Sequence, residues 1–112
     1  MKIFTSNLFD QRDNPVAYCI AAKTPAFFVG RTFKKLVPNW DLVCAYKRGE
    51  IDEQVFELLY RTENLSDLDA RVLAEELGDE AILCCWERAP NFCHRNIVAT
   101  WFIENGIECE EI

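Results

Sequence analysis

The sequence predicts an α/β fold, a small Rossmann-like domain in which three or four mostly parallel strands are flanked by helices. Residues 81–86 form a continuous apolar run of strand length, as expected of a central parallel strand covered on both faces. Helical patterns lie between and after the strands predicted at the beginning and near the end of the chain. At 112 residues the chain is long enough for one core, so we expect a single domain over residues 1–112.

Two further strands are predicted in the N-terminal part. Residues 2–6 mix apolar and polar side chains, which indicates a short strand that ends near Ser6 and Asn7. Residues 16–22 are apolar and bounded by prolines, and we interpret them as a second buried strand, although periodicity alone does not exclude a helix. The aromatic and basic segment 26–35 is predicted to be a loop, whose phenylalanines either stack on a base or fill the core.

Four helices are predicted from capping residues and from apolar positions spaced three and four residues apart. Asn39 is the expected cap of the first helix, and residues 66–69 resemble a capping box that opens the third. Leu58 and Val72 belong to the predicted apolar stripes of the second and third helices. The four helices are expected at residues 40–47, about 52–62, 66–77 and about 94–105, and a short closing segment follows at 107–112.

Charge and hydropathy limit the classes of partner. The net charge of −7 argues against duplex nucleic acid, because affinity for it depends largely on neutralising phosphates. Residues 1–48 nevertheless hold eight Lys or Arg against three Asp or Glu, so this half either attracts a small anion or is a solvated surface. The N-terminus lacks the apolar core of a signal peptide, and no window is apolar enough to span a membrane. We therefore expect a cytoplasmic protein without a membrane partner.

In a reducing compartment, cysteines are more often buried apolar groups or reactive groups than parts of a disulfide framework. None of the six forms a C-x-x-C pair, which argues against a zinc ribbon and a thioredoxin-like site. Adjacent side chains on a strand point to opposite faces, so at most one of Cys84 and Cys85 reaches the ligand edge, and we expect Cys84 in the core. The six are Cys19, Cys44, Cys84, Cys85, Cys93 and Cys109.

Residues 84–95 place groups capable of chemistry on a strand end, a loop and a helix start. Cys93 would meet the unpaired N–H groups and the dipole of the last helix, which lower the pKa of a thiol. His94 is the only histidine, and its ordinary pKa lies nearest to neutrality, so it is a candidate acid or base. Glu87 is expected to orient His94 or to act as a second acid or base.

Ligands of α/β folds gather beyond the carboxyl ends of the strands, an edge that Ser6 and Asn7 are expected to share. Arg95 at the helix start is the predicted group for holding a phosphate or carboxylate in a bidentate grip. A purely structural role is the alternative, in which Arg95 and Glu87 form a salt bridge and His94 contacts a carbonyl group.

Zinc binding is a further possibility, because Cys85, Cys93 and His94 are all zinc ligands in other proteins. Neighbouring ligands at 93 and 94 should diverge unless the loop turns sharply, so we assign no metal and no cofactor from the sequence. The phosphatase loop does not fit either, since five residues separate its Cys and Arg, whereas one residue separates Cys93 from Arg95.

The same stretch resembles a widespread prokaryotic family, the domain of unknown function numbered 488. Members show a strand that ends in Leu-Cys and Glu, a short loop with a proline, and Cys-His-Arg opening a helix, which here correspond to residues 83–87, Pro90 and residues 93–95. The resemblance is looser elsewhere, at residues 36–38, 45–51 and 56–60. It implies an α/β domain but no particular reaction.

On the family pattern, Cys85 and Glu87 match the strand-end Cys and Glu, which adds Cys85 to the catalytic candidates. Longer members carry an acidic and a basic residue at another strand end, a segment that residues 20–23 replace here. Lys23 is therefore a candidate for the missing cation. The candidate site then consists of catalytic Cys85, Glu87, Cys93 and His94, with Ser6, Asn7, Lys23 and Arg95 as ligand-binding residues.

These residues suggest a small enzyme acting on an anionic small molecule, such as a nucleotide or a phosphorylated metabolite. Cys93 or Cys85 would be the nucleophile, and Glu87 and His94 would move protons. The alternatives are a non-catalytic module that binds a ligand or a protein through the same pocket, and a zinc-binding domain.

Overall fold

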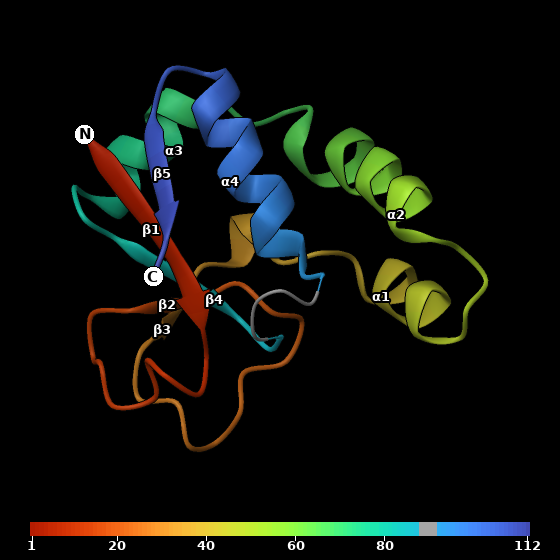
Figure 1. The fold of residues 1–112 in the computed structure, drawn as a ribbon, viewed down its shortest axis with the longest axis horizontal. Helices are drawn as coiled ribbons and strands as arrows, with labels where there is room; N and C mark the ends of the chain where they lie inside the picture. The colour runs from red at the N-terminus through yellow and green to blue at the C-terminus, as the bar shows by residue number, and fades with distance from the viewer. Residues whose placement is uncertain (88–91) are drawn as a thin grey trace.

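Five parallel strands form one sheet at the centre of the computed structural model, which describes residues 1–87 and 92–112 (Figure 1). Each hydrogen-bonded pair of neighbouring strands in this part of the chain is parallel, and their order is β3-β2-β4-β1-β5. The strands are β1 Lys2–Asn7, β2 Tyr18–Cys19, β3 Arg31–Thr32, β4 Ile82–Cys85 and β5 Glu108–Glu111.

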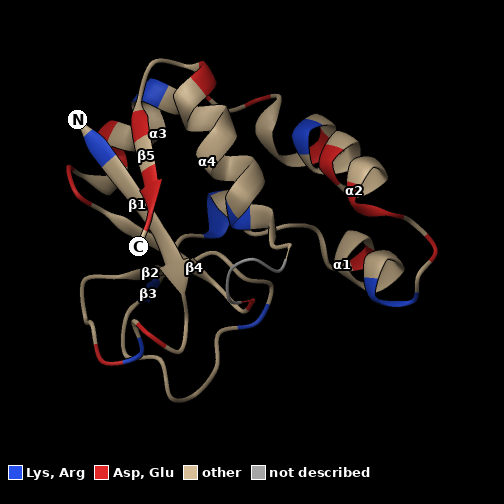
Figure 2. Ribbon diagram, in the orientation of Figure 1, with Lys and Arg blue, Asp and Glu red and all other residues tan. Residues whose placement is uncertain are grey.

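The predicted α/β class with a parallel sheet is confirmed, but the sheet has more strands than the three or four expected. The additional strands are the two edges, β3 and β5. Both consist mainly of exposed polar or charged residues, so neither produces the apolar run by which a buried strand is recognised. Charged side chains on an edge strand also discourage pairing with another chain, and Figure 2 shows acidic residues along β5.

The strand expected over residues 16–22 is also shorter than predicted, because only Tyr18–Cys19 pair with β4 and β3. Val16 is 63 % exposed, whereas Ile20 and Ala21 are buried in loop conformation. The apolar run therefore predicts burial correctly at Ile20 and Ala21 but not at Val16, and it overestimates the length of the strand.

The helices lie on one face of the sheet and beside it. Helix α4, His94–Glu104, packs against β1, β4 and β5, while α1, Trp40–Lys47, and α2, Glu53–Tyr60, pack together to one side (Figure 1). A π-helical segment, Arg61–Leu65, continues α2, and α3, Ala70–Leu77, packs on α4. None of the described helices is long and apolar enough to cross a membrane.

Two helix predictions need correction. Helix α3 begins at Ala70 rather than at 66, because the Asp69 carboxylate caps it by accepting hydrogen bonds from the N–H groups of Arg71 and Val72. Leu58 and Val72, predicted to be buried, are 64 % and 54 % exposed. Both helices have only eight residues, and a few buried positions on each are enough to dock it.

The two faces of the sheet are covered differently, and β4 shows this residue by residue. Leu83 and Cys85 belong to the main core, which also includes buried residues of α2, α3 and α4. Cys84 points to the opposite face, where it packs with Leu8 and Phe28 from loops. The prediction that Cys84 lies in the core is thus confirmed, and burial raises the pKa of its thiol to about 12.

Candidate functional site

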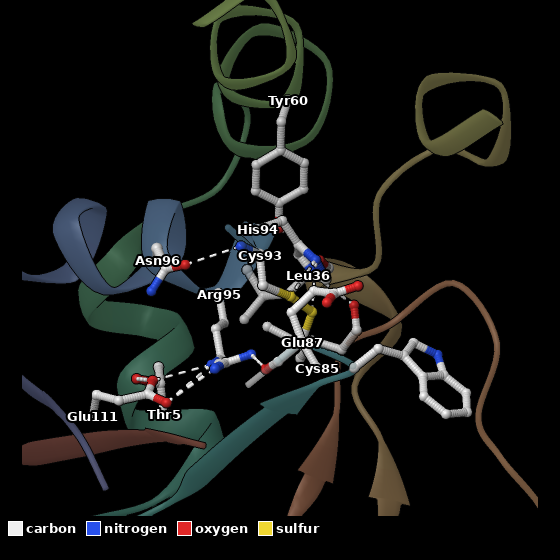
Figure 3. Close-up of a disulfide and its surroundings, with 12 residues drawn as sticks. Thr5, Leu36, Tyr60, Cys85, Glu87, Cys93, His94, Arg95, Asn96 and Glu111 are labelled. Carbon is white, nitrogen blue, oxygen red and sulfur yellow. Dashed lines mark hydrogen bonds and ion pairs between the residues drawn. A yellow bond between two sulfur atoms is a disulfide. The ribbon is translucent and has the colours of Figure 1, made fainter. Parts of the chain in front are cut away.

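The candidate site lies where the end of β4 meets the start of α4. Cys85 is the last residue of β4, and Cys93 is the N-terminal cap of α4 in an extended conformation, with φ −147° and ψ 151°. His94 is the first helical residue. The Asn96 side chain accepts a hydrogen bond from the Cys93 N–H at 3.0 Å, which fixes the chain as it enters the helix (Figure 3).

Cys85 and Cys93 are joined by a disulfide bond, and each residue is about 5 % exposed or less. The preference for free thiols over a disulfide framework therefore holds for four cysteines, Cys19, Cys44, Cys84 and Cys109, and fails for this pair. Eight positions separate the two cysteines in sequence, and only the return of the chain from β4 to α4 brings them together.

The His94 ring is held with one nitrogen on a carbonyl group and the other toward the two sulfur atoms. Its Nε2 lies 2.6 Å from the carbonyl oxygen of Ile20. Because a carbonyl oxygen only accepts hydrogen bonds, Nε2 carries the proton and donates it. Nδ1 is then the unprotonated nitrogen, 3.4 Å from Sγ of Cys85 and 3.9 Å from Sγ of Cys93.

The environment keeps this imidazole neutral. The pKa of His94 is lowered to about 4, mainly by burial. The hydrogen bond to Ile20 acts in the opposite direction, and the positive charge of Arg95 contributes to the lowering. The edge of the ring also contacts Tyr60, with 5.5 Å between the ring centres. The Tyr60 hydroxyl donates a hydrogen bond to the Leu36 carbonyl oxygen at 2.6 Å. This bond fixes the position of the Tyr60 ring that packs against His94.

Arg95 points away from the sulfur atoms and is fully buried. Its Nε and Nη2 each donate to the Glu111 carboxylate at 3.0 Å, and its Nη1 donates to the backbone carbonyl of Glu87 (Figure 3). The Thr5 hydroxyl donates to the same carboxylate at 2.6 Å. Burial raises the pKa of Glu111, but the hydrogen bonds from Arg95 and Thr5 outweigh it, and the net effect is a lowered pKa.

A cavity of about 480 Å³ opens beside the disulfide and His94. Two lysines in the cavity wall lie close to the ring of Trp40. Nζ of Lys23 is 4.6 Å and Nζ of Lys47 is 5.9 Å from the centre of this ring. The remaining lining is largely apolar and aromatic: Ala21, Ala22, Pro38, Val43, Tyr46, Phe56, Trp86 and Phe92, with Glu87 adding a carboxylate.

The sequence was compared with protein families, curated proteins and solved structures. The profile of the family DUF488-N3a, described as the active DUF488-N3 subclade, matches residues 16–106, which is most of the chain. The protein belongs to the DUF488 family. The resemblance seen in its Cys-Glu and Cys-His-Arg motifs is thereby confirmed. No curated protein and no solved structure matched the chain significantly.

In this DUF488 domain, five of the eight predicted site residues line the cavity, namely Lys23, Cys85, Glu87, Cys93 and His94. The other three are engaged elsewhere in the protein. The Ser6 hydroxyl donates to the Ile112 carbonyl oxygen at 3.2 Å, and the Asn7 side chain binds Asp10. Arg95 forms the ion pair with Glu111, so the alternative of a salt bridge to the Glu87 side chain is replaced by a contact with the Glu87 backbone.

Sequence reasoning missed Trp40 and Lys47 as neighbours of the DUF488 motif residues. Both lie on α1, whose position beside the cavity depends on how the helix packs and leaves no local pattern. The one available signal was the excess of basic residues in the first 48 positions, which includes both cavity lysines.

Proposed function

We propose that this DUF488 protein is an enzyme acting on a small anionic molecule of the nucleotide or phosphorylated-metabolite class. Its reacting centre would be the Cys85–Cys93 pair with His94. The observation that carries the proposal is that the unprotonated Nδ1 of His94 faces both sulfur atoms at the wall of a cavity. The family description, which calls the subclade active, agrees with a catalytic role.

The proposed chemistry begins from the reduced pair. Nδ1 of His94 takes the proton of the nearer thiol, that of Cys85, and leaves a thiolate. The thiolate forms a bond to an electrophilic atom of the substrate, the bond to the leaving group breaks, and His94 returns its proton to that group. Water then cleaves the sulfur–substrate bond, so the thiol is regenerated.

The surrounding groups favour these steps. Cys93 caps α4, where the N–H groups and the helix dipole favour negative charge. Glu87 lines the same cavity. Burial, followed by the negative charges of Glu53 and Glu87, raises the pKa of the Tyr46 phenol in the cavity wall. Glu87 is therefore placed to exchange protons with a molecule in the cavity.

The walls of the cavity support the proposed substrate class. A volume of about 480 Å³ lies in the range of small-molecule sites. Lys23 and Lys47 provide positive charge for a phosphate or carboxylate, and aromatic side chains such as Trp40 offer faces on which a base can stack. Arg95, the cation predicted to hold the anion, forms an ion pair with Glu111. Among the residues that the structure describes, Lys23 and Lys47 are the cations of the cavity wall.

The experiment measures binding and turnover separately. Nucleotides and sugar phosphates are added to the reduced protein, and melting temperature and product formation are followed. We expect one of these classes to stabilise the wild type, Lys47→Ala to weaken that binding, and Lys34→Ala, an exposed lysine outside the cavity, to leave it unchanged. Cys85→Ser should retain binding and lose turnover.

The outcomes separate an enzyme from a binding module. Saturable binding without any product, in the wild type as in Cys85→Ser, would replace the enzyme by a non-catalytic module. Binding that Lys47→Ala and Lys23→Ala leave unchanged would contradict the proposed substrate site itself.

A further inference from the structure

Cys85, Cys93 and His94 bring three metal-ligating atoms close together. In the part of the chain that the structure describes, the two Sγ atoms and a ring nitrogen of His94 all lie within 4.8 Å of one another. Nδ1 is 3.4 Å from one sulfur and 3.9 Å from the other. Tetrahedral zinc, with Zn–S bonds of about 2.3 Å and Zn–N bonds of about 2.0–2.1 Å, separates such ligands by roughly 3.6 Å. The two nitrogen–sulfur distances lie on either side of that value, whereas the two sulfur atoms are bonded to each other and must separate after reduction before both can bind zinc.

The histidine is oriented as a metal ligand usually is. Metal-bound histidines almost always donate their second ring N–H to a carbonyl or carboxylate group, which directs the ring. Here Nε2–H donates to the Ile20 carbonyl oxygen, and Tyr60 contacts the ring from the side. Nδ1 is therefore aimed at the sulfur atoms by the protein alone.

The backbone conformation at positions 93 and 94 lets both side chains face the same site, although adjacent ligands were expected to diverge. Cys93 is extended and His94 is already helical, so the chain changes direction between them. This change brings their side chains to the same side, where each approaches Cys85. The divergence expected from the sequence was wrong because the two residues lie on opposite sides of a helix boundary.

We propose that the reduced protein binds one Zn²⁺ ion through Sγ of Cys85, Sγ of Cys93 and Nδ1 of His94. A dithiol reductant supplies two electrons and two protons to the disulfide and is itself oxidised to a cyclic disulfide. Zinc then displaces both thiol protons, which pass to solvent. Two thiolates neutralise the charge of Zn²⁺, so the buried site carries no net charge. Thiolate and imidazole ligands favour zinc over magnesium or calcium, which prefer oxygen ligands.

The fourth position of this zinc site would open to the cavity. No other Cys, His, Asp or Glu among residues 1–87 and 92–112 joins the cluster, and all three ligands line the cavity. Three protein ligands with an open position are the arrangement of catalytic zinc, where water or substrate is the fourth ligand. Glu87 lines the same cavity and is placed to accept a proton from that water.

Zinc binding goes beyond the proposed function, because it requires no substrate. A hydrolytic role for the zinc-bound water does rest on that function, since it takes the same anionic substrate class. With the metal in place, the water would replace the thiolate as the attacking group.

The first test is the zinc content of the protein. Protein reduced by a dithiol is incubated with zinc, desalted and analysed for metal. We expect about one zinc per chain, and almost none on the oxidised protein, which has the same sequence. Cys85→Ser should weaken zinc binding by more than the roughly 10–100-fold that loss of an outer-shell partner costs. Cys84→Ser, on the same strand but facing the other way, should bind zinc as the wild type does.

A second measurement avoids variants that fold poorly. Zinc is added to the reduced wild type before alkylation, and each cysteine is quantified by mass spectrometry. We expect zinc to protect Cys85 and Cys93 and to leave Cys44, a half-buried free thiol, unprotected.

Two results would overturn the zinc site. One is a reduced wild type that retains no zinc after desalting, and the other is protection of all cysteines to the same extent. Neither result would contradict the proposed thiol chemistry, which is tested separately by measuring substrate binding and turnover of the reduced protein with a chelator added.

Discussion

Arg95 and Glu111 form a bidentate ion pair that connects the start of α4 to the edge strand β5. Both Nε and Nη2 of the fully buried guanidinium lie 3.0 Å from the carboxylate, and Thr5 on β1 donates to the same group. The third donor of Arg95, Nη1, reaches the Glu87 carbonyl just beyond β4. One buried cation therefore connects the helix start, three strand regions and the rim of the cavity, and its role here is to position the site.

Removing the charge of Glu111 should destabilise the protein. In Glu111→Gln the buried guanidinium loses its counter-charge, and we expect a loss of about 1.5–3 kcal/mol in the free energy of unfolding, as for a hydrogen bond to a charged group. Urea denaturation measures this loss. Glu110→Gln is the matched control, because its partner Lys2 is at the surface, and it should change stability much less. Equal effects of the two variants would contradict a special role for the Arg95 pair.

The same pair should make stability depend on acid pH. The pKa of Glu111 is lower in the folded protein than its ordinary value of 4.5, so its contribution is complete above pH 4.5. The contribution is lost as the pH falls through the lowered pKa, because the protonated carboxyl no longer balances Arg95. We expect the stability difference between wild type and Glu111→Gln to be constant at neutral pH and to shrink below about pH 4.5. A difference that is independent of pH down to the acid transition would refute this assignment.

Reduction of the Cys85–Cys93 bond should also lower stability. The bond closes a loop with a sequence separation of 8, and closing a loop of this size in the unfolded chain is worth about 2–3 kcal/mol. Denaturation with and without a dithiol, in the presence of a chelator, measures the difference. The double variant Cys85→Ser/Cys93→Ser should not respond to the reductant. A wild type with the same denaturation midpoint in both conditions would show that the bond contributes nothing.

Tyr60→Phe tests the support behind His94. The change keeps the aromatic contact with the imidazole but removes a buried hydroxyl, so the Leu36 carbonyl oxygen loses its donor. We expect a loss of about 1–2 kcal/mol in the free energy of unfolding. Tyr46→Phe, at a half-buried position, should cost less because the partner of its hydroxyl, the exposed carboxylate of Glu53, remains in contact with water. If Tyr46→Phe were the more destabilising change, the anchoring role of Tyr60 would be wrong.

Strong local patterns predicted the elements that carry the site. The strand Ile82–Cys85 lies within the predicted apolar run 81–86, and the last helix starts at His94 as predicted. Both were predictable because burial and helical spacing act over a few neighbouring residues. The same patterns place Cys85, Glu87, Cys93 and His94 at one edge of the sheet, and all four line the cavity there. The edge strand Glu108–Glu111 escaped prediction because its charged side chains are exposed and only its backbone pairs.

Partners distant in sequence were not predictable. Arg95 has the chemistry of an anion-binding residue, but its guanidinium forms an ion pair with Glu111. Nothing near Arg95 in the chain indicates this partner, because Glu111 lies on a strand without an apolar pattern. Trp40 and Lys47 reach the cavity through the packing of α1, which the sequence does not determine locally. The disulfide likewise depends on the direction in which the chain returns from β4 to α4.

The most direct test of the reactive centre is the alkylation rate of each cysteine in the reduced, chelator-treated protein near neutral pH. Iodoacetamide is added, and the six thiols are followed by mass spectrometry. We predict that Cys85 or Cys93, although both are buried, reacts faster than the more accessible Cys44, and that His94→Phe removes this difference. If Cys44 reacts fastest and His94→Phe changes nothing, the thiols beside the cavity are not activated, and the proposed reacting centre of Cys85, Cys93 and His94 is wrong.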